Sequence, residues 1–250
     1  MKFSIITVTF NSVRTLSDTI KSIVSQKNVE IEYILVDGCS TDGTLDIINE
    51  YKFFINKFVS EKDNGIYDAM NKGLALATGD IIGFLHSDDV YSNNLVLSKV
   101  KEYFENFQLD ALYGDIDYFA NNEFTTPVRR YKSNRFSPNK IGWGWMPAHP
   151  SLFLRRNVYI KSGNFKTDYK IAGDYEFVAR IFHHNELIFH YLPEVLVNMR
   201  MGGVSTGGFF NSIILNKEVL RACRENDIST NIFKILSKYP AKLIDKFFNK

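Results

Sequence analysis

The first 110 residues alternate short runs of β-branched and aromatic residues with longer segments of helical periodicity. The expected strands cover residues 3–8, 32–37, 57–61 and 81–85, and the expected helices cover 12–26, 44–51, 66–77 and 94–107. In the first helix, Leu16, Ile20 and Ile23 fall on one face. This alternation predicts an α/β fold in which a mostly parallel, Rossmann-like sheet is flanked by helices.

Polar and glycine-rich segments follow each expected strand. They are TFNS after the first strand, GCSTDGT after the second, KDNG after the third and HSDD after the fourth. In open parallel sheets, ligands bind beyond the carboxyl ends of the strands. Each segment alone is an ordinary turn sequence, but four of them would meet at one edge of the sheet. This edge is therefore the expected site.

Composition narrows the classes of protein. With 45% hydrophobic and 23% charged residues the chain is globular, and its 250 residues are enough for one large α/β domain or two small ones. A net charge of +2 gives no reason to expect a nucleic-acid partner. The dinucleotide motif GxGxxG and the P-loop motif are both absent.

Targeting and redox signals favour the cytoplasm. Cys39 and Cys223 form no CxxC pair and no Cys/His cluster, so we expect neither a disulfide framework nor a structural zinc site. The apolar run near the N-terminus is too short for the core of a signal peptide, and we expect no membrane-spanning helix.

Two adjacent carboxylates, Asp88 and Asp89, follow the fourth expected strand. Like charges this close destabilise the fold unless a cation or several donors compensate. Carboxylates without Cys or His clusters suit Mg²⁺ or Mn²⁺, which often bridge protein oxygens to phosphates. Alternatively, the pair caps the helix that begins near Asn94.

Two further segments carry polar side chains suited to a ligand. Asp37 ends the second strand and precedes small residues, so its carboxylate is placed to accept a hydrogen bond from a base or a ribose. A helix from Ile66 would place Asp68, Asn71 and Lys72 on one face. That polar face is equally typical of a helix surface in contact with water.

Five motifs occur in an order that resembles the family 2 glycosyltransferases with a GT-A fold. They are TVTFN (7–11), VDGCSTDGT (36–44), EKDNGIYDAMNKG (61–73), ATGDIIGFLHSDD (77–89) and IAGDYEF (171–177), and the resemblance extends over roughly residues 3–205. The stretch from DNGIYDAMNKG to SDD is similar to the subgroup that builds bacterial capsule, exopolysaccharide and lipopolysaccharide chains. The resemblance implies a smaller acceptor-side lobe and a C-terminal helical tail beside the Rossmann-like sheet.

The resemblance also implies donor-site residues. Asp88 and Asp89 match the DxD-like motif, with Asp89 as the more direct ligand of a divalent Mn²⁺ or Mg²⁺. His86 stands where the family often has Asp, which leaves the choice of metal open. The implied nucleotide- and donor-binding residues are Thr7, Thr9, Asn11, Asp37, Ser40, Asp68, Lys72, Asp88 and Arg200.

The acceptor side carries the implied catalytic base. In IAGDYEF, Asp174 matches the base of the family and Glu176 is its nearest competitor, expected to contact the acceptor; Asp174 is also placed to cap the helix that follows. Trp145 is a candidate for packing on an acceptor sugar or for the core. His149 is a candidate for contact with the metal or the diphosphate, or for a structural role.

The function that follows from the resemblance is an inverting transfer of a sugar. We expect a nucleotide-sugar donor, with UDP favoured as the commonest carrier in the family, and a glycan acceptor attached to a polyprenyl diphosphate. Residues 1–115 would bind the donor, 116–205 would bind the acceptor and supply the base, and 206–250 would form the tail. The alternatives are a non-catalytic nucleotide-sugar-binding regulator and a metal-dependent nucleotidyltransferase.

The C-terminal segment, residues 232–250, is basic and amphipathic. Lysines recur among Phe, Ile and Leu residues, and Pro240 should divide the segment into two short helices. Such helices suit an anionic membrane surface, or they pack on the core with their lysines in water. We therefore expect a cytoplasmic protein with peripheral contact at the inner face of the cell membrane.

Overall fold

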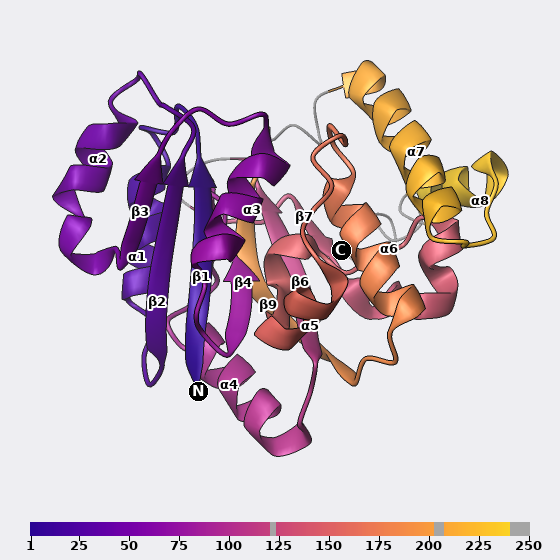
Figure 1. Cartoon of the computed structure of the whole chain (residues 1–250), viewed down its shortest axis with the longest axis horizontal. Helices are drawn as coiled ribbons and strands as arrows, with labels where there is room; N and C mark the ends of the chain where they lie inside the picture. The colour runs from indigo at the N-terminus through magenta and orange to yellow at the C-terminus, as the bar shows by residue number, and fades with distance from the viewer. Residues whose placement is uncertain (121–123, 203–207, 241–250) are drawn as a thin grey trace.

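The computed structural model describes residues 1–120, 124–202 and 208–240 (Figure 1). The strands are β1 (Lys2–Thr9), β2 (Glu30–Asp37), β3 (Lys57–Ser60), β4 (Ile81–Phe84), β5 (Asp89–Tyr91), β6 (Ala111–Phe119), β7 (Arg129–Tyr131), β8 (Leu152–Arg155) and β9 (Phe189–Arg200). The α-helices are α1 (Leu16–Val24), α2 (Thr44–Glu50), α3 (Ile66–Leu76), α4 (Val96–Phe107), α5 (Arg156–Ser162), α6 (Gly173–His184), α7 (Gly208–Glu225) and α8 (Ile232–Leu236). Short 3₁₀ turns are η1 (Lys52–Phe54), η2 (Ser133–Arg135), η3 (Pro138–Trp143) and η4 (His149–Ser151).

One sheet runs through the molecule in the order β3-β2-β1-β4-β8-β6-β9-β5, and β7 pairs with β6. The strands β3, β2, β1 and β4 are all parallel, so their carboxyl ends lie at one edge, as expected. Antiparallel pairing of β8 with both β4 and β6 joins the second half of the sheet to the first. The prediction of a parallel sheet flanked by helices is confirmed, and the second half adds antiparallel strands to it.

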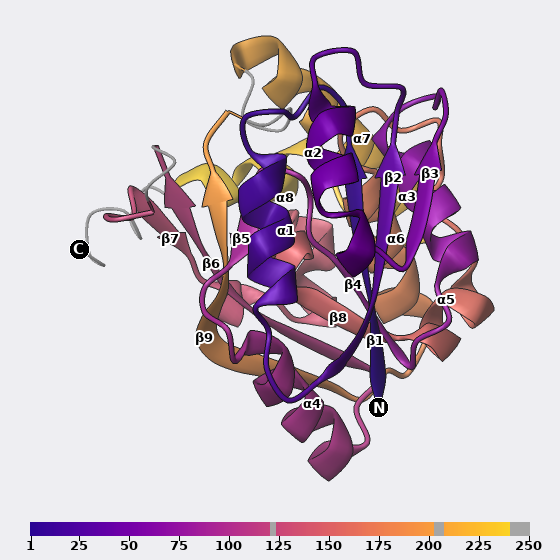
Figure 2. The same cartoon turned by 90° about the vertical axis from the view of Figure 1, so that its left-hand side faces the viewer.

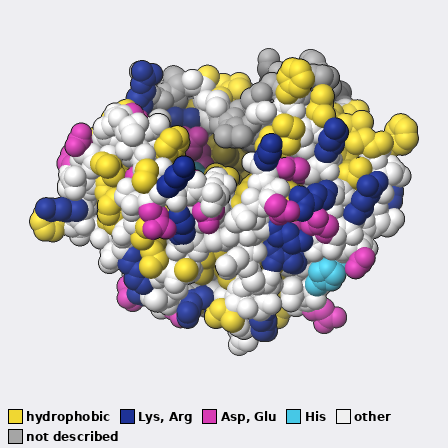
Figure 3. All heavy atoms as spheres, turned by 45° about the horizontal axis from the view of Figure 1, so that its top comes forward, with side chains coloured by type: hydrophobic (Ala, Val, Ile, Leu, Met, Phe, Trp, Pro, Cys, Tyr) yellow, Lys and Arg dark blue, Asp and Glu magenta, His cyan; other side chains and the backbone are white. Residues whose placement is uncertain are grey.

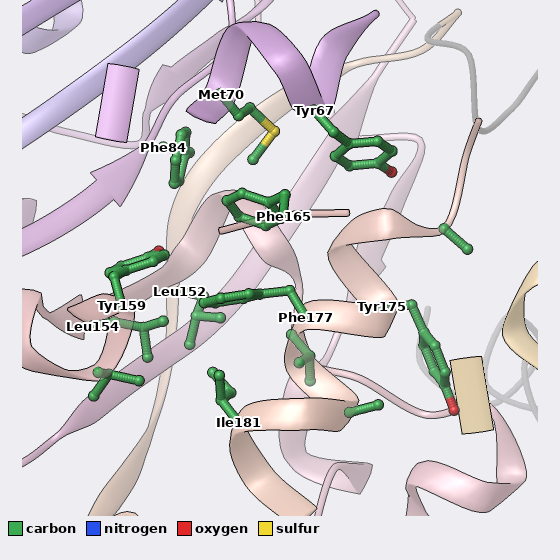
Figure 4. Close-up of a cluster of buried hydrophobic side chains, with 14 of the residues drawn as sticks. Tyr67, Met70, Phe84, Leu152, Leu154, Tyr159, Phe165, Tyr175, Phe177 and Ile181 are labelled. Carbon is green, nitrogen blue, oxygen red and sulfur yellow. The ribbon is translucent and has the colours of Figure 1, made fainter. Parts of the chain in front are cut away.

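Helices cover both faces of the sheet, and each face has its own hydrophobic core (Figure 2). The helices α1, α2 and α4 pack on one face, where Leu16, Ile20 and Ile23 of α1 are buried as predicted. The helices α3, α5 and α6 pack on the other face, around Phe165 and Phe177, whose ring centroids are 4.6 Å apart (Figure 4).

The first helix begins at Leu16, four residues later than predicted. The segment before it is held by the loop after β2: Asn11 Oδ1 accepts a hydrogen bond from the Thr41 amide at 2.9 Å, and the Ser12 amide donates to Thr44 Oγ1 at 2.8 Å. These contacts between loops satisfy the polar groups that would otherwise have favoured an earlier helix start.

The second half of the chain continues the same sheet. The predicted boundary at residue 115 falls inside β6, so the donor and acceptor regions share a strand. The helices α7 and α8 lie together at the end of the chain (Figure 1). Of the tail predicted from 232 to 250, residues 241–250 lie outside the described residues. Among the residues that the structure does describe, no helix combines the length and apolar character needed to cross a bilayer.

Candidate active site

Asp37 is a fully buried carboxylate at the carboxyl edge of the parallel strands. Its side chain is fully buried and accepts hydrogen bonds from the Ser40 amide, from Ser40 Oγ and, at 2.7 Å, from Ser60 Oγ of β3. Gly38 follows, and a Cβ atom there would lie 2.5 Å from a carboxylate oxygen of Asp63, a residue not singled out in the sequence. Asp37 and its hydrogen-bond partner Ser40 therefore lie at the end of β2, and Asp63 approaches the backbone of Gly38 beside them.

The predicted residues of β1 divide by position. Thr7 is fully buried and its hydroxyl donates to the Leu85 carbonyl at 2.7 Å, so it links β1 to the residue after β4. Thr9 is buried at the strand end, and its hydroxyl has no hydrogen-bond partner in the described part of the chain. Asn11 is exposed, and its backbone amide donates to Ser40 Oγ at 2.8 Å. Of these three, Thr9 and Asn11 lie at the edge itself.

The polar face predicted for α3 is present at its N-terminal end. Asp68 accepts a hydrogen bond from the Asn64 amide at 3.0 Å and so closes the turn that begins the helix. Lys72 Nζ contacts the Glu61 carboxylate at 3.0 Å, with Asp68 at 3.7 Å. These carboxylates raise the pKa of Lys72, led by the hydrogen bond to Glu61, so its side chain remains a cation beside the loop after β3.

The two adjacent aspartates differ in burial. Asp88 is half-buried at a turn, whereas Asp89 begins β5, is fully buried, and has two carboxylate oxygens without a hydrogen-bond partner among the described residues. Burial and then the Asp88 carboxylate raise the pKa of Asp89 well above its usual range. A buried carboxylate in this state requires a proton or a cation.

Arg200 fixes the loop that carries these aspartates. Its guanidinium donates to the Asp88 carbonyl at 2.9 Å and to the Asp18 carboxylate of α1 at 2.6 Å. The side chain is buried, with 7% of its surface exposed. Arg200 thus brings a positive charge near Asp89 and holds the backbone of Asp88 in place.

The chemistry of this loop fits a hard divalent ion whose coordination is completed by a ligand. Among the residues in the described ranges, no group of three His, Cys, Asp or Glu side chains is arranged to hold a metal. Asp88 and Asp89 can supply carboxylate oxygens, and phosphate oxygens and water normally complete the shell of Mg²⁺ or Mn²⁺. His149 is buried with its ring 6.2 Å from that of His86, and burial lowers the pKa of each to about 4. Both imidazoles are therefore neutral at pH 7.

Asp174 lines a cavity of about 690 Å³. It is the second residue of α6, and burial raises the pKa of its carboxyl to about 6. Tyr118 and Met199 line the same cavity, and Met199 pairs with Asp89 in the register of β5 and β9. The cavity therefore extends from Asp174 to β9, the strand that pairs with β5.

Two residues that the sequence did not single out hold Asp174 in place. The Tyr67 hydroxyl of α3 donates to the Ile171 carbonyl at 2.7 Å and lies 3.4 Å from Asp174 Oδ1. Figure 4 shows the Tyr67 ring directed towards the start of α6. The Glu218 carboxylate of α7 accepts hydrogen bonds from the amides of residues 170, 171 and 172. The adjacency of Tyr67 to Asp68 was a usable signal, whereas nothing local marks Glu218.

Two predicted acceptor residues lie away from this cavity. Glu176 is fully buried on another face of α6, where it pairs with Arg180 at 3.0 Å and with Lys166 at 3.1 Å. Trp145 lines a separate, smaller cavity, and the Arg135 guanidinium lies 5.5 Å from its ring centroid. His149, in contrast, lines the large cavity together with Asp174.

Comparison with solved structures identifies the fold. TarS from S. aureus, solved with UDP-GlcNAc, aligns with a TM-score of 0.70 at 21% identity over all of this chain and 73% of that one. The mannosyltransferase PcManGT from Pyrobaculum calidifontis, solved with GDP-Man and Mn²⁺, aligns with a TM-score of 0.66 at 19% identity over 94% and 68% of the two chains. The predicted GT-A architecture is confirmed.

Sequence comparison identifies the family. A PGL/p-HBAD biosynthesis glycosyltransferase of Mycobacterium bovis is 31% identical over 226 residues, which cover 88% of this chain and 82% of the relative. An uncharacterized glycosyltransferase of Mycobacterium tuberculosis is 31% identical over 180 residues, or 71% and 67% of the two chains. The family model described as glycosyl transferase family 2 matches residues 4–163. The chain therefore belongs to glycosyl transferase family 2.

Proposed function

We propose that this glycosyltransferase moves a sugar from a nucleotide-sugar, with a UDP-sugar favoured, to a hydroxyl of a glycan acceptor by an inverting displacement. The observation that carries the proposal is Asp174, a carboxyl of raised pKa in a cavity that reaches Met199, the partner of Asp89 in the register of β5 and β9. The UDP-GlcNAc bound to TarS and the GDP-Man and Mn²⁺ bound to PcManGT support a nucleotide-sugar donor.

On the donor side, the groups at the ends of β1 and β2 receive the nucleoside. Asp37 is held by Ser40 and Ser60 in one orientation, so its carboxylate is ordered before a base or ribose arrives. Thr9 supplies a hydroxyl at the same edge, and Asn11 supplies a side-chain amide. Thr7 lies within β1, and its hydrogen bond to the Leu85 carbonyl links this strand to the residue after β4. Lys72 brings a cation, with Asp68, to the loop after β3.

Asp88 and Asp89 would hold a divalent metal, either Mn²⁺ or Mg²⁺. When bound, the ion neutralises charge on the leaving diphosphate. Arg200 holds the backbone of this loop through the Asp88 carbonyl and adds positive charge nearby. His149, neutral and buried at the cavity wall, would contact the diphosphate or the ion.

Asp174 acts as the general base for the acceptor. Its carboxylate removes the proton from the acceptor hydroxyl while that oxygen attacks the anomeric carbon from the face opposite the diphosphate. The new C–O bond forms as the bond between the anomeric carbon and the diphosphate breaks, and the electron pair leaves with the nucleoside diphosphate. A single displacement of this kind inverts the anomeric configuration.

The acceptor is a glycan chain on a lipid carrier, polyprenyl diphosphate in class, in the synthesis of a bacterial surface polysaccharide. This part of the proposal rests on the motif subgroup and on the basic, apolar segment 232–250, whose described part includes the exposed Phe233. It places the enzyme in the cytoplasm, peripherally at the inner face of the membrane.

Asp174→Asn tests the central assignment. The variant removes the base but keeps the shape of the side chain, so turnover of the donor should fall by roughly 10²- to 10⁴-fold while nucleotide affinity remains within a factor of two or three of the wild type. Donor turnover and calorimetric nucleotide binding measure the two effects. Asp168→Asn makes the same change at an exposed ion pair outside the cavity and serves as the control. Near-normal turnover of Asp174→Asn would reject Asp174 as the base.

A further inference from the structure

A second, smaller cavity lies behind the segment that forms one wall of the large one. Its volume is about 260 Å³, and Trp143 and Trp145 line it. Gly144, between the two tryptophans, and Met146, directly after them, line the large cavity instead. Gly144 adopts a φ of +76°, and a Cβ atom there would lie 3.1 Å from the Lys238 side chain. This backbone conformation allows the segment to present its tryptophans away from Asp174.

The small cavity is positively charged. Arg135 and Lys140 line it together with the tryptophans and Ser237, and Lys234 lies 5.6 Å from the ring centroid of Trp143. No acidic side chain is among these lining residues of the described chain. The surrounding sequence has the same bias: residues 124–167 contain nine Lys and Arg residues and no Asp or Glu. The cavity therefore suits an anion rather than a neutral sugar.

Apolar side chains project from the helices beside this cavity. The helix α8 contacts η3, which carries Lys140 and Trp143, and it also contacts α7. Phe233 of α8 is 81% exposed and Trp143 is 43% exposed. Figure 3 shows hydrophobic side chains gathered over α7 and α8. The exposed large hydrophobic residues of these two helices are Phe210, Ile213, Ile232, Phe233 and Leu236.

We propose that this face docks on an anionic lipid surface, with a phospholipid phosphate bound in the small cavity by Arg135 and Lys140. Exposed phenylalanine and tryptophan beside cations is the pattern that binds the interface between head groups and acyl chains. Phe233 enters this interface, and Trp143, with Lys234 over its ring, lies at head-group depth. The inference rests on the proposed function and deepens it, since it holds the enzyme at the membrane that carries the proposed lipid-linked acceptor.

Co-sedimentation with vesicles tests the docking face. The wild type should bind vesicles of phosphatidylcholine with phosphatidylglycerol and not vesicles of phosphatidylcholine alone, and added salt should weaken the binding. Removal of two cations in Arg135→Ala/Lys140→Ala should reduce the partition coefficient roughly 25-fold, at about fivefold per cation. Equal binding of the wild type to both kinds of vesicle would overturn the proposal.

Lys52 and Phe53, in the first half of the sequence, provide a matched control. Lys52 lies 5.3 Å from the ring centroid of Phe53, which is 89% exposed, so this pair repeats the cation-over-ring arrangement of Lys234 and Trp143. Trp143→Ala/Lys234→Ala should lose vesicle binding, and Lys52→Ala/Phe53→Ala should keep it. An equal loss in both variants would contradict a specific docking face.

Two further measurements separate the alternatives. If calorimetry detects inorganic phosphate binding that Arg135→Ala/Lys140→Ala abolishes, while vesicle binding of that variant is unchanged, the cavity takes free phosphate and the lipid assignment is wrong. Nucleotide affinity of the same variants should equal that of the wild type, because none of these residues lies at the donor edge. Failure of the docking inference is thereby distinguishable from failure of the proposed transferase function.

Discussion

The Asp174 carboxyl combines burial with a location in the large cavity, and these two properties set the pH dependence of the reaction. A base must be deprotonated, and burial raises the pKa of Asp174 to about 6. We therefore expect kcat/KM for donor turnover to fall about tenfold per pH unit below pH 6. A pH–rate profile measures the break; a plateau that continues to pH 4.5 would show that another group is the base.

The raised pKa of Asp174 also makes the stability of the folded protein fall as the pH rises. Because the folded-state pKa of Asp174 is raised, its contribution favours folding below the unfolded value of about 3.9 and is lost as pH rises through 6. Asp174→Asn, neutral at every pH, should accordingly be more stable than the wild type at pH 7. Such a trade of stability against activity is expected of a base held in a buried site.

Glu32 illustrates the reverse case, a buried carboxylate that stabilises the sheet. It accepts hydrogen bonds from Ser4 Oγ at 2.6 Å and from the Thr78 amide at 2.7 Å, and Lys57 Nζ lies 3.0 Å away. Burial acts to raise its pKa, but these donors outweigh burial and hold the pKa of Glu32 well below its usual range. Its stabilisation is therefore present above the unfolded value of about 4.3 and is lost as pH falls through the folded value.

Glu32→Gln should lower the free energy of unfolding by about 2–4 kcal/mol at pH 7, because the donors lose a charged acceptor. The difference from the wild type should shrink as the pH is lowered below about 4.3. Urea unfolding at several pH values measures it. Glu30→Gln, at the exposed start of the same strand, should stay within about 0.5 kcal/mol of the wild type, and a similar loss in both variants would contradict this account.

At the scale of elements, the contact between α3 and α6 couples the donor side to Asp174. A Cβ atom on Gly173 would lie 2.7 Å from the Tyr67 ring, so these two helices approach as closely as a glycine allows. Gly173→Ala should cost about 1–3 kcal/mol of unfolding free energy through overpacking, although Ala alone favours a helix. Thermal unfolding measures this cost.

A double-mutant cycle identifies the cause of that cost. With Tyr67→Ala already present, the ring is gone and Gly173→Ala should be neutral or slightly stabilising. The coupling free energy then equals most of the cost in the wild type. If Gly173→Ala costs the same in both backgrounds, the contact between the helices is not its origin.

The predictable elements are those whose signal is local. The apolar stripe of α1 and the polar segments after the first four strands located the parallel half of the sheet and its edge. The strands β5, β8 and β9 were not predicted, because their pairing depends on partners far away in sequence, such as Ile81 with Arg155. Hydrophobic periodicity does not report such pairing.

The candidate site was predictable to the same extent. Asp37 and Asp89 stand at strand ends and Asp174 at the start of a helix; Asp37 lies at the carboxyl edge, and Asp174 lines the large cavity. Glu176 follows Asp174 by two helical positions, which are 200° apart, so helical geometry already separates their faces. The side to which Trp145 points depends on the backbone at Gly144 and had no local signal.

At the scale of the molecule, the shared sheet determines how the two sides of the site meet. The strand β6 crosses the predicted boundary at residue 115, and β9 pairs with both β6 and β5. The large cavity, which Met199 of β9 lines, and the strand that begins at Asp89 therefore belong to one sheet. Nucleotide binding at the edge and proton removal at Asp174 are therefore expected to occur without a change in the sheet. The whole protein can therefore be tested with the nucleotide that we propose binds at the carboxyl edge of the parallel strands.

The most direct test is a calorimetric titration of the protein with UDP, GDP and dTDP, each with and without Mn²⁺, in the wild type and in Asp89→Asn. We expect one nucleotide, UDP first, to bind the wild type only when Mn²⁺ is present, and we expect Asp89→Asn to lose this Mn²⁺-dependent binding. Binding that is unchanged by Mn²⁺ or by the substitution would contradict the metal-assisted donor site.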